Sequence, residues 1–233
     1  MGTATGRRRI VILTGAGISA ESGLGTFRDA GGLWTQYDLE DVATPQGFAR
    51  DPVLVHEFYN ARRANCLEAS PNAAHVALAR LTAAWPDHVT LVTQNIDDLH
   101  ERAGARDVIH MHGELLRARC AACGHVWDAP KVMAADDPCP ACAAPATRPD
   151  VVWFGEFPYH MERIGAALAR ADLFVAIGTS GQVYPAAGFV EEAASSGAQT
   201  LELNLEPTAA RFDAQRTGPA STIVPDWVSE LLD

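Results

Sequence analysis

Short apolar segments separated by helical patterns constrain the fold of this chain more than any other feature. The first, residues 9–13, shows no alternation of polar and apolar residues, which is typical of a strand buried on both faces. Similar segments follow at 89–93, 108–110, 151–154, 173–177, 200–204 and 222–224, and helical patterns lie between several of them, at 98–103, 161–171, 185–195 and 226–232. Strands that alternate with helices predict an α/β fold with a doubly wound, Rossmann-like parallel sheet.

Two segments interrupt this alternation and predict a small inserted module. Residues 34–85 contain no convincing strand but at least two helical patterns, one over 52–68 and one that starts at Ser70-Pro71, a plausible N-cap followed by proline at the first helical position. Residues 117–149 are rich in Ala, Pro and Cys and show little periodicity. We therefore expect a single unit over 1–233, with the sheet domain built from 1–33, 86–116 and 150–233, a helical insertion over 34–85 and a cysteine-rich insertion over 117–149.

Four of the five cysteines form two close pairs, Cys120-x2-Cys123 and Cys139-x2-Cys142. Two such knuckles supply the tetrahedral sulfur shell that structural zinc prefers. The segment has few large apolar residues, so a metal would replace the missing core. Four cysteine ligands leave no open position for catalysis, and the sequence therefore predicts one structural Zn²⁺ in a zinc ribbon. Cys66 stands alone on a helix and is interpreted as a small core residue.

Composition and charge argue against several classes of partner. The 233 residues are 48% hydrophobic and 20% charged, which is enough for a buried core and argues against extended disorder. The chain has 18 Lys and Arg residues but 29 Asp and Glu residues, which gives a net charge of −11. This charge disfavours binding to nucleic acid and to anionic membranes. No segment approaches the ~20 apolar residues of a membrane span, and no export signal is visible. We expect a cytoplasmic protein, and a monomer is compatible with the sequence.

Small or polar residues follow four of the predicted strands, at the carboxyl ends where open parallel sheets bind ligands. The turn Gly15-Ala16-Gly17-Ile18-Ser19 can bring backbone N–H groups to a phosphate, although a packing turn has the same composition. The other segments are Gln94-Asn95-Ile96-Asp97, Gly178-Thr179-Ser180 and Asn204-Leu205-Glu206. Each alone is compatible with an ordinary turn or a helix cap. Together they indicate a site that holds phosphate and ribose groups.

His112, directly after the strand at 108–110, is a candidate general base because an unperturbed histidine has a pKa near 6.5. A lone histidine is more often structural, and His110, still within the strand, is not expected to react. An NAD-dependent dehydrogenase with structural zinc is an alternative, but the acidic end of a second strand about 20 residues after the glycine-rich turn is missing. A non-enzymatic zinc-knuckle binding module is another alternative.

In combination these residues resemble the sirtuins, the NAD-dependent protein-lysine deacylases. The resemblance extends from Ile10 to about Trp227. The segments that carry it, in the family's order, are Gly15 to Gly23, Thr26-Phe27-Arg28, Thr93 to Asp97, His112-Gly113, the four paired cysteines and Gly178-Thr179-Ser180. One departure is Gly25, where the family usually has proline; its loss is expected to loosen the cofactor loop but removes no reactive group.

The resemblance implies that NAD is consumed as a co-substrate. The acyl carbonyl oxygen of acyl-lysine attacks the ribose carbon that carries nicotinamide, and the products are nicotinamide, free lysine and O-acyl-ADP-ribose. His112 is implied as the base on a ribose hydroxyl, and Asn95 and Asp97 as further catalytic residues. The implied NAD-binding residues are Gly15, Ala16, Gly17, Ser19, Ala20, Phe27, Arg28, Trp34, Gln94, Asn95, Ile96, Asp97, Gly178, Thr179, Ser180, Asn204, Leu205, Glu206 and Ala220. Mono-ADP-ribosyl transfer to protein is an alternative within the family.

Tyr59 and Arg62, three residues apart on the helix predicted over 52–68, share one face. A guanidinium and a phenol suit a carboxylate, although a packed tyrosine beside a solvated arginine has the same spacing. The desuccinylase branch of the sirtuins has this pair and a small residue that Ala43 matches. The resemblance thus implies removal of succinyl, malonyl and also acetyl groups from lysines of protein substrates, with a general deacetylase as the alternative. The peptide is expected to add as a strand beside Val152, Phe154 and Gly155 on one side and residues 181–183 on the other.

Overall fold

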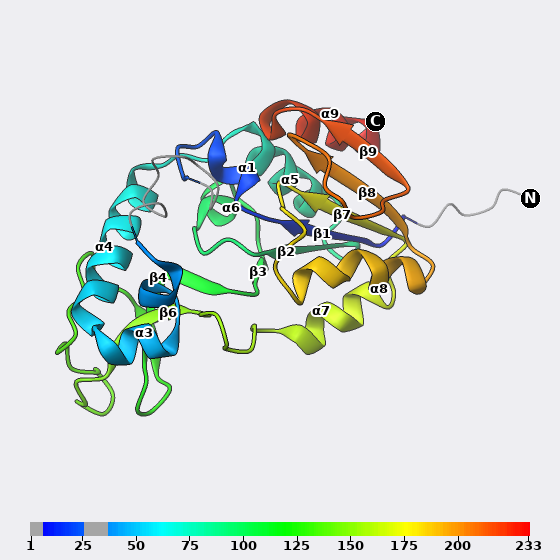
Figure 1. Cartoon of the computed structure of the whole chain (residues 1–233). Helices are drawn as coiled ribbons and strands as arrows, with labels where there is room; N and C mark the ends of the chain where they lie inside the picture. Colours follow the sequence, from blue (N-terminus) through cyan, green and yellow to red (C-terminus); the bar gives the residue numbers. More distant parts are fainter. Residues whose placement is uncertain (1–6, 26–36) are drawn as a thin grey trace, which may run out of the picture.

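The computed structural model describes residues 7–25 and 37–233. Its main feature is a six-stranded sheet in the order β3-β2-β1-β7-β8-β9, in which all neighbouring strands run parallel (Figure 1). The strands are β1 (Ile10–Thr14), β2 (Val89–Thr93), β3 (Ile109–His110), β7 (Leu173–Ile177), β8 (Gln199–Asn204) and β9 (Ala214–Thr217). This confirms the predicted Rossmann-like sheet. The strand order reverses between β1 and β7, which is where such sheets bind ligands.

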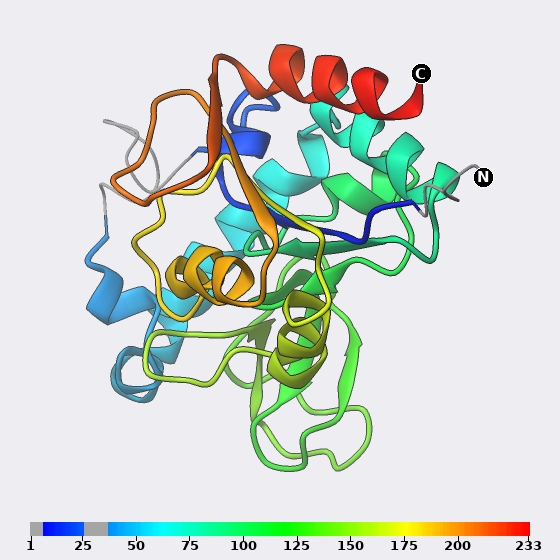
Figure 2. The same cartoon turned by 90° about the vertical axis from the view of Figure 1, so that its right-hand side faces the viewer.

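Helices cover both faces of this sheet. They are α5 (Ala73–Ala84) and α9 (Ala220–Leu232) on one face, and α7 (Met161–Leu168) and α8 (Phe189–Ser195) on the other (Figure 2). Within β1, Ile10 and Ile12 face the first helix layer, whereas Val11 and Leu13 face the second. Because both faces are buried, every residue of β1 and β7 is buried, which explains their uninterrupted apolar sequence.

A smaller part of the molecule lies beside the sheet domain and contains both short strands and helices (Figure 1). Its elements are α2 (Leu39–Val42), α3 (Pro45–Arg50), α4 (Pro52–Glu68), β4 (Gly113–Cys120), β5 (Val126–Asp128) and β6 (Thr147–Val151). The strands form an antiparallel sheet in the order β5-β4-β6. Phe58 of α4 shares one apolar cluster with Leu115 of β4 and Val151 of β6. The helical part and the ribbon of the predicted module therefore pack on each other.

Two strands predicted from apolar segments are wrong. The segment 151–154 does not join the parallel sheet, because β6 ends at Val151 and pairs with β4 instead. The segment 222–224 lies within α9, where Val224, Trp227 and Val228 recur at helical spacing and are buried against α5. This packing outweighs the preference of Thr, Ile and Val for strands.

One strand and one helix start also differ from the prediction. The edge strand β9 is mostly exposed, so its polar sequence carries no apolar signal. Helix α5 begins at Ala73 rather than at Pro71, because Asn72 is its N-cap. The Asn72 side chain accepts a hydrogen bond from the backbone N–H of Ala74 at 2.9 Å, and Nδ1 of His75 accepts from the backbone N–H of Asn72 at 3.3 Å.

Short helices follow three strands of the main sheet: α1 (Gly17–Ala20) after β1, α6 (Leu99–Arg102) after β2 and the 3₁₀ helix η2 (Ala186–Gly188) after β7. Three of the predicted polar segments lie at these strand-to-helix junctions, and the fourth, Asn204-Leu205-Glu206, lies between β8 and β9. Among the residues that the structure describes, no helix is long and apolar enough to cross a membrane.

Candidate functional site

The loops that follow β1 and β7 touch through their backbones. The N–H of Gly17 donates to the carbonyl oxygen of Gly178 at 2.8 Å. The N–H of Gly15 donates to the carbonyl oxygen of Ile177 at 3.0 Å. Gly178 has φ +60°, and a Cβ atom there would lie 2.4 Å from the backbone nitrogen of Ile18. Only glycine fits such an approach. Two of the predicted NAD-binding segments are therefore brought together at the switch point of the sheet.

Gln94 and Asn204 attach two further segments to the loop after β7. Nε2 of Gln94 donates to the Thr179 hydroxyl at 2.9 Å, and Nδ2 of Asn204 donates to the Thr179 carbonyl oxygen at 2.8 Å. The end of β1 is tied in as well, because the Gln94 N–H donates to the Thr14 carbonyl oxygen at 2.9 Å. All four polar segments expected at strand ends thus lie at one edge of the sheet.

Asn95 and Asp97 meet at the hydroxyl of Ser19. Nδ2 of Asn95 donates to Oγ of Ser19 at 3.2 Å, and this hydroxyl donates to Oδ2 of Asp97 at 3.2 Å. The other oxygen of Asp97 accepts from the N–H of Leu99, the first residue of α6, at 3.2 Å, but the N-cap of this helix is Asp98 rather than Asp97. Burial raises the pKa of the Asp97 carboxyl, although the hydrogen bonds from Leu99 and Ser19 oppose this.

His112 and His110 differ in what their ring nitrogens contact. Nδ1 of His112 lies 3.0 Å from the Gln94 carbonyl oxygen. Both nitrogens of His110 are engaged, Nδ1 with the Asn95 carbonyl oxygen at 3.2 Å and Nε2 with the Glu101 carboxylate at 2.8 Å. Burial lowers the pKa of His112, and the bond to Gln94 only partly offsets it. The neutral imidazole is therefore favoured, and among the described residues Nε2 of His112 has no hydrogen-bond partner.

A buried polar network supports these residues, and the sequence analysis did not identify it. Nε2 of His100 lies 3.0 Å from the Thr14 hydroxyl, which donates to the Thr93 hydroxyl at 2.8 Å; the Thr93 hydroxyl accepts from the Asn95 N–H at 3.0 Å. His75 contacts the Ser19 hydroxyl through Nε2 at 3.3 Å. No local sequence pattern indicates this network, because it joins residues from distant segments.

The two residues predicted to select the acyl group share one face of α4. The ring of Tyr59 is buried, and its hydroxyl accepts a hydrogen bond from Nε1 of Trp153 at 3.0 Å. The guanidinium carbon of Arg62 lies 5.7 Å from the Tyr59 ring centre and 5.6 Å from that of Phe58. Arg62 is only partly exposed. The packed tyrosine of the alternative interpretation is thus observed, whereas the arginine beside it packs on aromatic rings and is only partly in contact with solvent.

The expected peptide-binding segment runs between Ala43 and His112. The Val152 N–H donates to the His112 carbonyl oxygen at 2.9 Å, and the Phe154 N–H donates to the Ala43 carbonyl oxygen at 2.9 Å. Ala43 is buried, Phe154 is 49% exposed, and Gly155 has φ +89°. Predicted residues for the acyl chain, the peptide and proton transfer are thus linked through two backbone hydrogen bonds.

The four paired cysteines lie together at the tip of the small antiparallel sheet, with all four sulfur atoms within 4.8 Å of one another. The sulfurs of Cys120 and Cys142 are 3.7 Å apart, and those of Cys123 and Cys139 are 3.8 Å apart. A tetrahedral ZnS₄ centre with bonds of about 2.3 Å has sulfur separations of about 3.8 Å. The cluster fits a structural zinc ion. Cys66 lies outside it and is buried in the core, as predicted.

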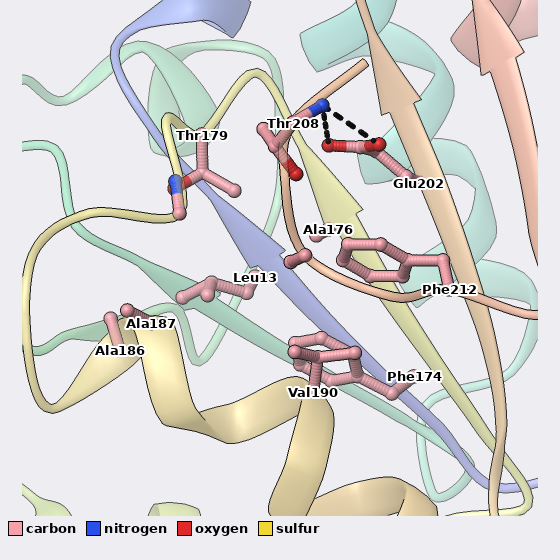
Figure 3. A pocket seen from close by; sticks show the side chains of 12 residues that line it. Leu13, Phe174, Ala176, Thr179, Ala186, Ala187, Val190, Glu202, Thr208 and Phe212 are labelled. Atoms are coloured by element: carbon pink, nitrogen blue, oxygen red, sulfur yellow. Dashed lines mark hydrogen bonds between the residues drawn. The ribbon is translucent and has the colours of Figure 1, made fainter.

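Figure 3 shows a small cavity between the main sheet and α8. Phe174, Val190 and Phe212 lie at one end and Thr179, Thr208 and Glu202 at the other. The buried Glu202 carboxylate accepts hydrogen bonds from the Thr208 N–H, at 3.2 and 3.3 Å, and from Nε2 of Gln215, at 2.9 Å. Of the predicted NAD-binding residues that the structure describes, Thr179 alone lines this cavity.

The remaining predicted cofactor residues lie at the rim of the site. Ala20, Leu205 and Glu206 are exposed, and Ala220 is the first residue of α9. Glu21, which directly follows α1, links that helix to the start of α9. Its carboxylate accepts hydrogen bonds from the backbone N–H and the hydroxyl of Ser221. Ala16, Ile96 and Ser180 lie within the three loops already described. Phe27, Arg28 and Trp34 fall outside the described residues.

Comparison with known proteins decides the family. A model of the Sir2 family matches residues 15–185. The chain is 58% identical over 233 residues to an NAD-dependent protein deacylase of Caulobacter vibrioides, covering 97% of this chain and 98% of the relative. A deacylase of the same description from Salmonella typhimurium is 57% identical over 229 residues, covering 96% of this chain and 84% of the relative. The chain belongs to the Sir2 family.

Solved Sir2 structures have the same fold as this sirtuin. A Sir2 homologue in complex with NAD matches with a TM-score of 0.87 at 39% identity, covering 96% of this chain and 89% of the other. A mutant homologue in complex with ADP-ribose matches with a TM-score of 0.89 at 38% identity, covering 96% and 91%. The sirtuin is thus an NAD-dependent protein deacylase that uses NAD as a co-substrate. The dehydrogenase and the non-enzymatic binding module are not supported.

Proposed function

We propose that this sirtuin removes acidic acyl groups, succinyl and malonyl, as well as acetyl, from lysine side chains of proteins. The observation that carries the proposal is the position of Arg62 and Tyr59, which lie side by side on α4, with Tyr59 in the same apolar cluster as Ala43. Nicotinamide and O-acyl-ADP-ribose are the expected co-products.

Arg62 supplies the charge that an acidic acyl group needs. Burial lowers the pKa of its guanidinium, while Tyr59 and Asp97 raise it, and an arginine remains a cation at neutral pH. Its planar group can donate two parallel hydrogen bonds to a carboxylate, and such bonds are stronger away from bulk water. A neutral acetyl group has no distal carboxylate and cannot use this interaction.

Ala43 leaves room for the longer acyl chain. Its methyl side chain is buried in the apolar cluster that contains Tyr59 and Trp153. The Ala43 carbonyl oxygen is bonded to the N–H of Phe154, so the wall of the acyl site and the peptide segment are fixed relative to each other. A bulky aromatic residue at this position would fill the space that a succinyl group needs.

For the reaction itself, we assign the proton transfer to Nε2 of His112. Once nicotinamide has left and the acyl oxygen is bonded to the ribose carbon, His112 accepts the proton of a ribose hydroxyl, whose oxygen attacks the acyl carbon. Asn95 and Asp97, joined through Ser19, orient nicotinamide and ribose. The backbone N–H groups of the glycine-rich loop after β1 bind phosphate.

The Arg62→Met variant tests the acyl assignment, because methionine keeps an apolar stem and removes the charge. A charge-assisted hydrogen bond contributes about 1.5–3 kcal/mol. The ratio of kcat/KM for succinyl-lysine to that for acetyl-lysine should therefore fall by roughly ten- to a hundredfold. The exposed Arg80 of α5 offers a matched control, and Arg80→Met should leave this ratio as in the wild type. An unchanged ratio in Arg62→Met would leave a general deacetylase.

A further inference from the structure

We propose that Trp153 is a positioning residue for acyl selectivity, whose indole N–H directs the Tyr59 hydroxyl hydrogen toward the carboxylate of the acyl group. The inference rests on the proposed function, in which Tyr59 and Arg62 bind that carboxylate. Trp153 itself touches neither NAD nor the reacting atoms in this account. It acts through Tyr59.

The direction of the hydrogen bond between Trp153 and Tyr59 follows from chemistry. An indole nitrogen can donate but cannot accept, so the Tyr59 oxygen must be the acceptor in the 3.0 Å contact. The hydroxyl hydrogen must then point to another acceptor. Among the described residues, this hydroxyl donates no hydrogen bond. The donor function of Tyr59 thus remains available to a ligand with an acceptor oxygen.

Burial keeps Tyr59 in the form that donates. It raises the pKa of the phenol above its ordinary value of 10.0, although Arg62 opposes this shift. The hydroxyl therefore stays protonated at neutral pH. A carboxylate placed beside Arg62 would meet two kinds of donor, the guanidinium and an oriented hydroxyl, whereas a methyl group would meet neither.

Trp153 is itself held on several sides. The guanidinium carbon of Arg148 lies 3.5 Å from the indole ring centre, and Arg148 bonds both carboxylate oxygens of Glu156, at 2.7 and 2.9 Å. The same Glu156 carboxylate accepts a hydrogen bond from the backbone N–H of Trp153 at 2.9 Å. Phe48 packs at 5.1 Å between ring centres. The indole is 2% exposed, so its N–H has one fixed direction.

The carboxylate of Glu156 is favoured in its ionised form. Burial opposes ionisation of Glu156, but the hydrogen bonds from Arg148 and from the Trp153 N–H outweigh it and lower the pKa. The carboxylate therefore holds the guanidinium flat against the indole across the neutral range. We infer a relay of position, in which Glu156 fixes Arg148, Arg148 fixes Trp153 and Trp153 orients Tyr59.

A double-mutant cycle separates this role from general packing. Trp153→Phe keeps an aromatic ring and removes the donor, and Tyr59→Phe removes only the hydroxyl. For each single variant, we expect the succinyl-to-acetyl ratio of kcat/KM to fall about three- to tenfold, mainly through KM for the succinyl peptide. The double variant should match Tyr59→Phe alone, because Trp153 acts through that hydroxyl.

The proposal is overturned if Trp153→Phe leaves the ratio unchanged, or if it lowers the ratio by the same factor when Tyr59 is already phenylalanine. Should Trp153→Phe fail to fold in thermal unfolding, Arg148→Lys tests the same point, since lysine keeps the charge and loses the planar fork. The ratio should fall, and an unchanged ratio would contradict the proposal. Arg62→Met distinguishes the failure of this inference from the failure of the proposed function. If the succinyl-to-acetyl ratio falls in Arg62→Met but not in Trp153→Phe, the proposed function stands and only the role of Trp153 is refuted.

Discussion

The backbone carbonyl oxygen of Gln94 lies 3.0 Å from Nδ1 of His112. A carbonyl oxygen can only accept, so Nδ1 carries the hydrogen and Nε2 keeps its lone pair. The side chain of the same Gln94 donates to Thr179 in the loop after β7. One residue thus sets the tautomer of the proposed base and ties it to the proposed cofactor loop.

Replacing His112 by alanine should remove most turnover while the fold and NAD binding persist. A general base typically contributes 10²–10⁴-fold, and alanine keeps the backbone hydrogen bond from Val152 to the carbonyl oxygen of residue 112. Steady-state kinetics with an acyl-lysine peptide and calorimetric titration with NAD measure the two effects. His110→Ala is the matched control and should reduce turnover much less, because both of its nitrogens are already bonded. Near-normal turnover in His112→Ala would contradict the assignment.

As the pH falls, kcat/KM should decline with a midpoint below the ordinary pKa range of histidine. Burial lowers the pKa of His112 from 6.5, and an imidazole can accept a proton only in its neutral form. Activity should therefore persist to a lower pH than a free imidazole would allow. The measurement is kcat/KM for the acyl peptide as the pH falls, with NAD saturating. A midpoint at or above 6.5 in the acid limb would show that another group controls it.

Each chain should bind about one zinc ion through the four paired cysteines. Cys142→Ser should release the metal and unfold the ribbon, because metal binding and local folding are coupled. Metal analysis and thermal unfolding test this together. Cys66 is the natural control, since it is a cysteine outside the cluster, and Cys66→Ala should keep the zinc. Active protein with substoichiometric zinc would count against the prediction.

Much of the fold could be predicted from sequence because the signals were local. An uninterrupted apolar segment predicted the buried strand over residues 9–13, and a helical pattern predicted the helix over residues 52–68. The prediction of the zinc site depended only on the spacing of the four paired cysteines. The convergence of the polar segments followed from the geometry of parallel sheets, in which strand ends with the same direction meet at one edge.

The rest depended on contacts between distant segments. The strand β9 has no apolar signal, and residues 222–224 became helical through packing on α5. The bond from Trp153 to Tyr59 joins residues 94 positions apart. The contact of His100 with Thr14 joins residues 86 positions apart. No local pattern indicates such pairs, because neither residue type is unusual for its own element.

Turnover of matched acyl-lysine peptides with NAD tests the central claim most directly. Peptides of one sequence that carry acetyl-, succinyl- or malonyl-lysine should all release nicotinamide, which follows from the family. We expect the succinyl and malonyl peptides to have higher kcat/KM than the acetyl peptide, because only they can use Arg62 and Tyr59. An acetyl peptide that is turned over as efficiently as the acidic ones, or more so, would contradict the account.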